Sequence, residues 1–301
     1  MVLTAPSHCL NCGAALQGTF CSHCGQRVIP AHPTVRELAG DAYDELVGWD
    51  GKFAATIRTL ITRPGALTHE FLEGRRARYL SPVRLYLMCS VVYFVAAAMV
   101  PLPVSNDGRF DFSVGVGVGS VAEQQTPGEA AFAKAVAAGS GALTPDDRIL
   151  VAQYISEQPG AFQPLMRAMA TDFAGLQRRI LEIMPRALFL LIPALAAILA
   201  LFHRRRPYPD HLYFALHLQT FAFAVLALSA VVQFGAPLWL IATAQMAAAM
   251  WILVYAILAQ RRVYGETWVR TLLTAVGTAM IYGTLWTSIS LAVTLWVSRG
   301  R

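Results

Sequence analysis

The sequence predicts an all-α integral membrane protein with about five transmembrane helices, an N-terminal zinc ribbon and amphipathic helices at the membrane interface. Of the 301 residues, 56% are hydrophobic and only 14% are charged, a composition more apolar than that of a soluble domain. The apolar residues gather in five segments, and a hydrocarbon core of about 30 Å needs about 20 apolar helical residues per crossing. Four of the five cysteines form two close pairs ahead of these segments.

Residues 1–29 contain the pattern C-x-x-C-G twice, and we expect them to form the zinc ribbon. A gap of two residues lets both thiolates of a pair reach one ion, and the glycine after each pair permits a tight turn. Four thiolates close a tetrahedral shell, so the expected role of one Zn²⁺ is structural. The predicted ligands are Cys9, Cys12, Cys21 and Cys24. Substitution of one ligand by His8 or His23, and reduced cysteines without a metal, are the alternatives.

Residues 30–82 are expected to form a linker and then helices at the cytoplasmic membrane surface. Apolar residues recur at helical spacing from Leu38 to Trp49, and again after a predicted N-cap at Asp50. The apolar stripe of the second stretch consists of Phe53, Ile57, Leu60 and Ile61. Both stretches are too short and too charged to cross a bilayer, so we expect interfacial helices with Trp49 as an anchor. A third short helix is expected over residues 66–72.

Residues 74–79, here called the collar, are basic and aromatic and lead into the first crossing. Basic residues at the end of a crossing favour the cytoplasmic side of the membrane. We expect the collar arginines to contact lipid headgroups in general, and a specific phosphate or anionic-lipid site is the alternative. These arginines are Arg75, Arg76 and Arg78.

The first crossing lies within residues 83–103 and the other four within residues 185–301. The expected crossings are Arg84–Leu102, Arg186–Phe202, Leu212–Phe234, Leu238–Ala259 and Thr271–Trp296. If the N-terminus is cytoplasmic, the arginines that flank these segments fall mostly on the cytoplasmic side, as the positive-inside rule requires.

Residues 104–184 are expected to be an extracytoplasmic segment of modest helices. Thr126-Pro127 and Thr144-Pro145 have the pattern of helix starts, and an amphipathic helix over 162–184 should run into the second crossing. The alternating glycines and valines of residues 114–119 lack the spacing of a nucleotide-binding loop.

Asp210, His211 and His217 are the candidate functional polar residues of the membrane block, because an ionisable group at membrane depth is costly without a partner. For His217, a hydrogen bond to a neighbouring helix is favoured over proton handling or substrate contact. No carboxylate accompanies the two histidines deeper in the bilayer, and the zinc-hydrolase, nucleophile-elbow, phosphate-loop and dinucleotide motifs are absent from the sequence. We therefore expect a protein that is not an enzyme.

Three blocks of the sequence carry a family resemblance: the paired C-x-x-C-G motifs, the segment from Trp49 to Pro82, and Asp210–His217. Arg261–Gly265 adds to it. Together they resemble an uncharacterised bacterial family of zinc-ribbon membrane proteins, domain of unknown function 3667. The resemblance implies the bacterial inner (cytoplasmic) membrane, and it brings no activity.

The expected function is recruitment of a partner, sensing or scaffolding by a cytosolic ribbon on a membrane anchor, with membrane lipids and a protein as partners. The alternative is transport or lipid handling through the bundle, using His211, His217 and the collar. A membrane-embedded enzyme would need a carboxylate or a second metal cluster near His217. Nucleic-acid binding ranks last, because the arginines behind the net charge of +6 gather at the ends of the apolar segments.

Overall fold

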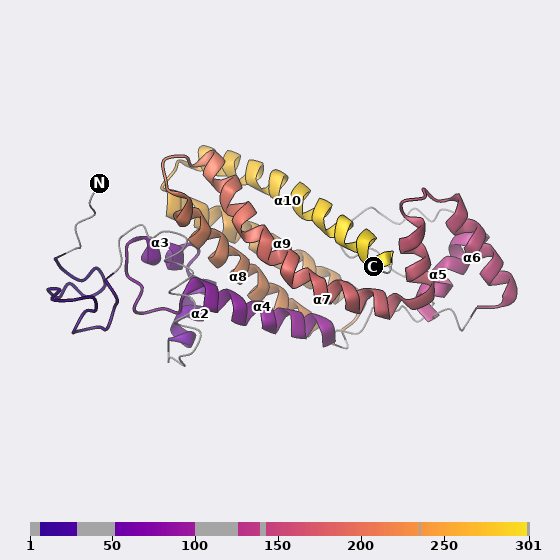
Figure 1. The fold of residues 1–301 in the computed structure, drawn as a ribbon, viewed down its shortest axis with the longest axis horizontal. Coiled ribbons are helices and arrows are strands. Elements are labelled where there is room, and N and C mark those ends of the chain that lie inside the picture. The colour runs from indigo at the N-terminus through magenta and orange to yellow at the C-terminus, as the bar shows by residue number, and fades with distance from the viewer. Residues whose placement is uncertain (1–6, 29–51, 100–125, 139–142, 235, 300–301) are drawn as a thin grey trace. The chain divides into compact units, whose positions relative to one another are not determined.

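The computed structural model describes residues 7–28, 52–99, 126–138, 143–234 and 236–299 (Figure 1). Over these residues the regular structure is helical, with two isolated β-bridges, His8–Ala15 and Phe20–Arg27, and no strand. The all-α prediction is therefore confirmed. The predicted interfacial helix over 38–49, its anchor Trp49 and the Gly/Val repeat lie outside the described residues.

Five helices of the described chain are long and apolar enough to cross a membrane. They are α4 (Pro82–Met99), the Gly175–Phe202 part of α7 (Gln163–Phe202), α8 (Tyr208–Val232), α9 (Leu238–Tyr264) and α10 (Trp268–Ser298). The chain is a multi-pass membrane protein, as the sequence predicts. Such helices satisfy all their backbone groups internally, which the bilayer requires.

The boundaries of all five crossings differ from the predicted ones by a few residues or more, and the differences in the first two crossings have a clear cause. The first crossing starts at Pro82 rather than Arg84, because a proline is tolerated in the first turn of a helix, where its missing N–H has no partner. The second is longer than Arg186–Phe202, because the predicted amphipathic helix continues directly into it as α7. Within α7, Asp172 has non-helical dihedral angles and separates two helical stretches.

The chain divides into two compact units. Unit 1 consists of Met1–Ala97, Phe189–Val231 and Ala244–Thr284, and unit 2 consists of Ala98–Leu188, Val232–Thr243 and Leu285–Arg301. In unit 1, α8 is the central helix: half of the residues in its most apolar stretch are buried, whereas only 11% are buried in the corresponding stretch of α9. The α8 core includes Phe214 and Phe221, and Phe221 stacks on Tyr255 of α9 with ring centroids 3.5 Å apart.

The short helices α2 (Phe53–Thr62) and α3 (Ala66–Leu72) belong to unit 1. The helix α2 begins at Phe53 and its N-cap is Lys52, so the prediction of Asp50 as the N-cap is wrong. Lys52 makes no side-chain capping hydrogen bond. The predicted apolar stripe is split as well, because Leu60 is buried whereas Phe53 and Ile61 are exposed. Thr56 shares the buried face because its Oγ1 accepts a hydrogen bond from the Leu80 N–H at 3.1 Å.

A tight turn joins α2 to α3 and touches α9. Gly65 has φ +70°, and a Cβ at this position would lie 2.8 Å from the carbonyl oxygen of Ala259. Only glycine fits both the left-handed backbone and this close approach. The turn is thereby fixed against the last part of α9.

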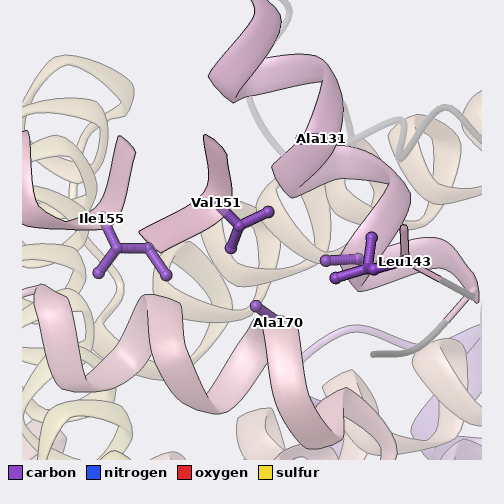
Figure 2. Packing of buried hydrophobic residues seen from close by; sticks show 6 residues of the cluster. Ala131, Leu143, Val151, Ile155 and Ala170 are labelled. Carbon is purple, nitrogen blue, oxygen red and sulfur yellow. The ribbon is translucent and has the colours of Figure 1, made fainter. Parts of the chain in front are cut away.

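Unit 2 contains α5 (Pro127–Ala138), α6 (Pro145–Glu157) and the first part of α7. Both helix starts lie where the sequence predicts them; Thr144 caps α6 in a reciprocal capping box with Asp147. Figure 2 shows Val151 and Ile155 of α6 directed toward Ala170 of α7. The buried cluster consists of Ala131, Ala135, Leu143, Val151, Ile155 and Ala170.

Candidate functional site

Four cysteine thiols converge in the segment of residues 7–28, here called the cysteine segment. They are Cys9, Cys12, Cys21 and Cys24, and their sulfur atoms all lie within 4.8 Å of one another. The Cys9–Cys24 and Cys12–Cys21 sulfur distances are both 3.6 Å. In a tetrahedral zinc site with Zn–S bonds of about 2.3 Å, neighbouring sulfurs lie about 3.8 Å apart. The group can therefore hold one metal ion, and among the described residues no histidine belongs to it.

Local backbone geometry brings each pair of thiols together. The Gly13 N–H donates to the Cys9 carbonyl at 2.8 Å, and the Gly25 N–H donates to the Cys21 carbonyl at 2.9 Å. Both glycines have positive φ, so the turn that follows each pair depends on them. The backbone N–H groups of Cys24 and His23 lower the pKa of the Cys21 thiol and so favour the thiolate, which is the metal-binding form.

The cysteine segment is bound to the collar through one glutamine. The Gln26 Nε2 donates to the Gly74 carbonyl at 2.7 Å, and its Oε1 accepts from the backbone N–H groups of Arg76 and Ala77, each at 3.1 Å. Leu10, which lies between Cys9 and Cys12, packs closely on Gly74: a Cβ at Gly74 would lie 2.5 Å from Leu10 Cδ1. Nothing in the C-x-x-C-G pattern indicated a role for Gln26.

Two of the three collar arginines are engaged within the chain. The Arg75 guanidinium forms a two-pronged ion pair with Glu70, at 2.7 and 3.0 Å, and this hydrogen bonding lowers the pKa of the Glu70 carboxyl. The Arg76 Nε donates to the Phe71 carbonyl at 3.3 Å, and its guanidinium lies 5.5 Å from the centre of the Tyr213 ring in α8. Arg78 is exposed.

His211 and His217 have different partners and do not share a site. The Nδ1 of His217 lies 3.0 Å from Thr68 Oγ1 of α3, and Phe71 packs edge-on against its ring. The Nδ1 of His211 lies 2.8 Å from the Tyr264 hydroxyl at the end of α9. Both histidines are buried, and within the described residues neither Nε2 has a hydrogen-bond partner.

A polar cluster surrounds His211, and sequence reasoning missed half of it. His203 stacks on Tyr264 with ring centroids 3.8 Å apart, and its Nε2 lies 3.4 Å from a carboxylate oxygen of Glu266. The other Glu266 oxygen accepts from Arg270 at 2.9 Å. Glu266 lies in the connection between α9 and α10, outside the predicted crossings, so the apolar pattern of the crossings gives it no role. A sequence signal for this cluster exists: the α7–α8 and α9–α10 connections both carry ionisable residues, and both are predicted on the same side of the membrane.

Asp210 completes this cluster on the α8 side. Its carboxylate is 3.7 Å from the Arg206 guanidinium, which also donates to the Val263 carbonyl at 3.0 Å. The cluster thus pairs two carboxylates with two arginines, and it ties the α7–α8 connection to the α9–α10 connection. The partly exposed arginines offset part of the cost of burying the Asp210 and Glu266 carboxylates.

One comparison with known proteins finds a match. Residues 50–94 match the family model of a protein of unknown function, DUF3667. No curated protein and no solved structure matches the chain. The matched segment contains α2, α3, the collar and most of α4, which is the part that contacts the cysteine segment through Gln26 and α8 through Thr68. Over residues 50–94, the chain is therefore similar to DUF3667, a family whose function is unknown.

Proposed function

We propose that the protein is a non-enzymatic membrane protein of the bacterial inner membrane, in which a cytosolic zinc ribbon docks a protein partner and communicates its state to the membrane helices. The observation that carries this proposal is the Gln26 bridge between the cysteine segment and the collar. Because Gln26 bonds to three backbone groups of the collar, the ribbon is attached to the collar by contacts in addition to the connecting chain.

A chain of contacts leads from the ribbon to the central helix. Gln26 holds the backbone at Arg76, and Arg76 in turn contacts the Phe71 carbonyl and the Tyr213 ring. Phe71 also packs on Tyr213 and His217, both in α8. A metal that orders the ribbon therefore also fixes the position of Gln26, and through it the collar that contacts α8.

Zinc is the ion that this ligand set favours. Four thiolates at near-tetrahedral spacing suit Zn²⁺, and a closed shell leaves no position for water or substrate, which supports a structural role. The positive-inside rule supports a cytosolic ribbon, because the collar, Arg204–Arg206 and Arg261-Arg262 lie at the same end of unit 1 as the cysteine segment.

Hydrogen exchange measured by mass spectrometry tests the coupling. We expect chelation of the metal to raise exchange in residues 7–28 and also in residues 66–80 of the full-length protein. The Gln26→Ala variant should keep its metal, measured by elemental analysis, while residues 66–80 no longer respond to chelation. The matched control is Cys89→Ser, which removes a thiol outside the metal group and should behave as wild type. An unchanged response of residues 66–80 in Gln26→Ala would overturn the coupling.

Crosslinking in the native membrane tests the docking. A partner that depends on the ribbon should be lost when Cys21 and Cys24 are both changed to serine, and should be kept in Cys89→Ser. A partner set that is identical in all three proteins contradicts the docking proposal.

The orientation is tested separately by labelling. An Asp146→Cys variant should react with a membrane-impermeant thiol reagent once the outer membrane alone is permeabilised. Labelling only after lysis of the inner membrane would place residues 143–157 in the cytoplasm and reverse the proposed topology.

A second candidate function is transport or lipid handling through the bundle. One observation favours it: His211 and His217 are buried, and the Nε2 atom of each has no hydrogen-bond partner among the described residues. Such a nitrogen is available to a proton or a polar ligand. Proton flux into liposomes that contain the purified protein tests this function: His217→Gln should lower the flux, and flux equal to that of empty liposomes contradicts it.

A further inference from the structure

A pocket at the end of α9 has no role in the function proposed above. It is an open cavity of about 370 Å³ lined by Pro64, Leu258, Arg261 and Arg262. One wall is the turn between α2 and α3, which Gly65 brings into contact with Ala259. The other wall is the last part of α9, a helix long and apolar enough to cross the membrane. The pocket therefore lies at the level where a crossing helix leaves the hydrocarbon.

Among the described residues, no carboxylate neutralises the arginines of this pocket. The Arg262 guanidinium donates to the Pro64 carbonyl at 2.6 Å, and the Arg261 guanidinium lies 3.7 Å from the centre of the Trp268 ring. Neither arginine forms an ion pair with a carboxylate in the part of the chain that the structure describes. Nearby Arg206 and Arg270, in contrast, each have a carboxylate partner. Two adjacent uncompensated guanidinium groups are a site for a phosphate oxygen.

The face of α9 below the pocket is apolar and open. Trp251, Val254 and Leu258 recur at intervals of three and four residues, so they share one face of the helix with Arg261 and Arg262. Each of the three apolar side chains is at least about a third exposed. Trp268 is exposed beside Arg261, which is the place of an aromatic residue at the membrane interface. A hydrocarbon chain can follow this face while its headgroup remains at the arginines.

We propose that this pocket binds an anionic phospholipid, with its phosphate at Arg261 and Arg262 and one acyl chain along Leu258, Val254 and Trp251. The favourable interaction of basic residues with a helix C-terminus explains why arginines stand in the last turn of α9. It does not explain the pocket against Pro64 or the continuous apolar face. Free phosphate would use only the arginines, whereas a lipid uses both parts of the site. This proposal is independent of the zinc ribbon.

Native mass spectrometry of the full-length protein in detergent tests the site. The probes are phosphatidylglycerol and phosphatidylcholine with identical acyl chains, and inorganic phosphate as competitor. We expect phosphatidylglycerol to bind wild type in preference to phosphatidylcholine, and millimolar phosphate to leave it bound. The affinity of the variant with Arg261→Gln and Arg262→Gln for phosphatidylglycerol should fall by about tenfold or more.

Two further variants distinguish a loss of lipid binding from a loss of folding. The single variant Arg261→Gln keeps the Arg262–Pro64 hydrogen bond and should still lose most of the preference for phosphatidylglycerol, with an unchanged melting temperature in detergent. The matched control, Arg204→Gln with Arg205→Gln, changes two exposed arginines of the α7–α8 connection and should bind as wild type. Equal loss in the control, equal binding of both lipids by wild type, or displacement by phosphate alone would overturn the proposal.

Discussion

The cysteine segment and the α5–α6 region are both small and outside the crossings, yet they are stabilised by different physics. In the described part of the cysteine segment only two side chains are buried, and both are thiols, Cys9 and Cys21. The α5–α6 region instead buries an apolar cluster together with the start of α7. A segment of this size cannot bury enough apolar surface to offset its chain entropy, so we expect a metal at its four thiols to supply the stability that the apolar cluster supplies in the helical region.

Loss of one metal ligand should produce the largest effect. In Cys21→Ser we expect residues 7–28 to unfold, because apparent zinc-binding energies of about 10–16 kcal/mol supply the folding energy of such sites. Limited proteolysis should cleave this segment while α5 and α6 remain resistant, and Cys89→Ser serves as the control. If protease sensitivity of residues 7–28 does not change, the structural metal site is refuted.

Truncation of the apolar cluster should affect the other region alone. Ile155 is buried on α6 facing Ala170, and Ile155→Ala should destabilise the α5–α6 region by about 2–5 kcal/mol, at the lower end if the small alanines close the gap. Hydrogen exchange should rise in residues 126–157, whereas metal content should stay at the wild-type value. The exposed neighbour Ile149, changed to alanine, provides the control.

Removal of the helix cap should produce a smaller change in the same region. Thr144 accepts a hydrogen bond from the Asp147 N–H at 3.2 Å, and the Asp147 carboxylate accepts one from the Thr144 N–H at 3.0 Å. Thr144→Ala should cost about 1 kcal/mol of local stability, and Thr144→Ser should recover most of it. Equal exchange rates at the first turn of α6 in all three proteins would contradict this role.

The smallest effect should be a pH dependence of the α5–α6 region. A hydrogen bond from Lys134, at 2.6 Å, and the capping contacts lower the pKa of Asp147 to about 2. Since the folded-state pKa lies below the ordinary value of about 3.9, this stabilisation is present above that pH and is lost as the pH falls from about 4 toward 2. Lys134→Met should shift the Asp147 titration, followed by NMR, to higher pH. The cysteine segment should respond differently, because protonation of its thiolates releases the metal.

Features that depend on neighbours along the chain could be predicted. The thiols of each pair are three residues apart, so the metal group follows from local turns at Gly13 and Gly25. The crossings follow from apolar length alone, because the bilayer imposes the same requirement on every segment. Asp50 is a good capping residue by its type, but the N-cap of α2 is Lys52. The buried face of α2 includes Thr56, whose contact with Leu80 lies 24 residues away and is not visible in the local pattern.

The sequence by itself therefore determined the helical membrane architecture and a four-cysteine metal group, both products of local pattern. Only the tertiary structure decided which polar groups meet: Thr68 with His217 across 149 residues, Arg262 with Pro64 across 198, and Gln26 with the collar. Within the part of the chain that the structure describes, it also divided the arginines into those that pair with a carboxylate, such as Arg75, and those that do not, such as Arg261. The physical reason is that a hydrogen bond or ion pair acts only at contact distance, and which distant residues reach that distance depends on how the helices pack.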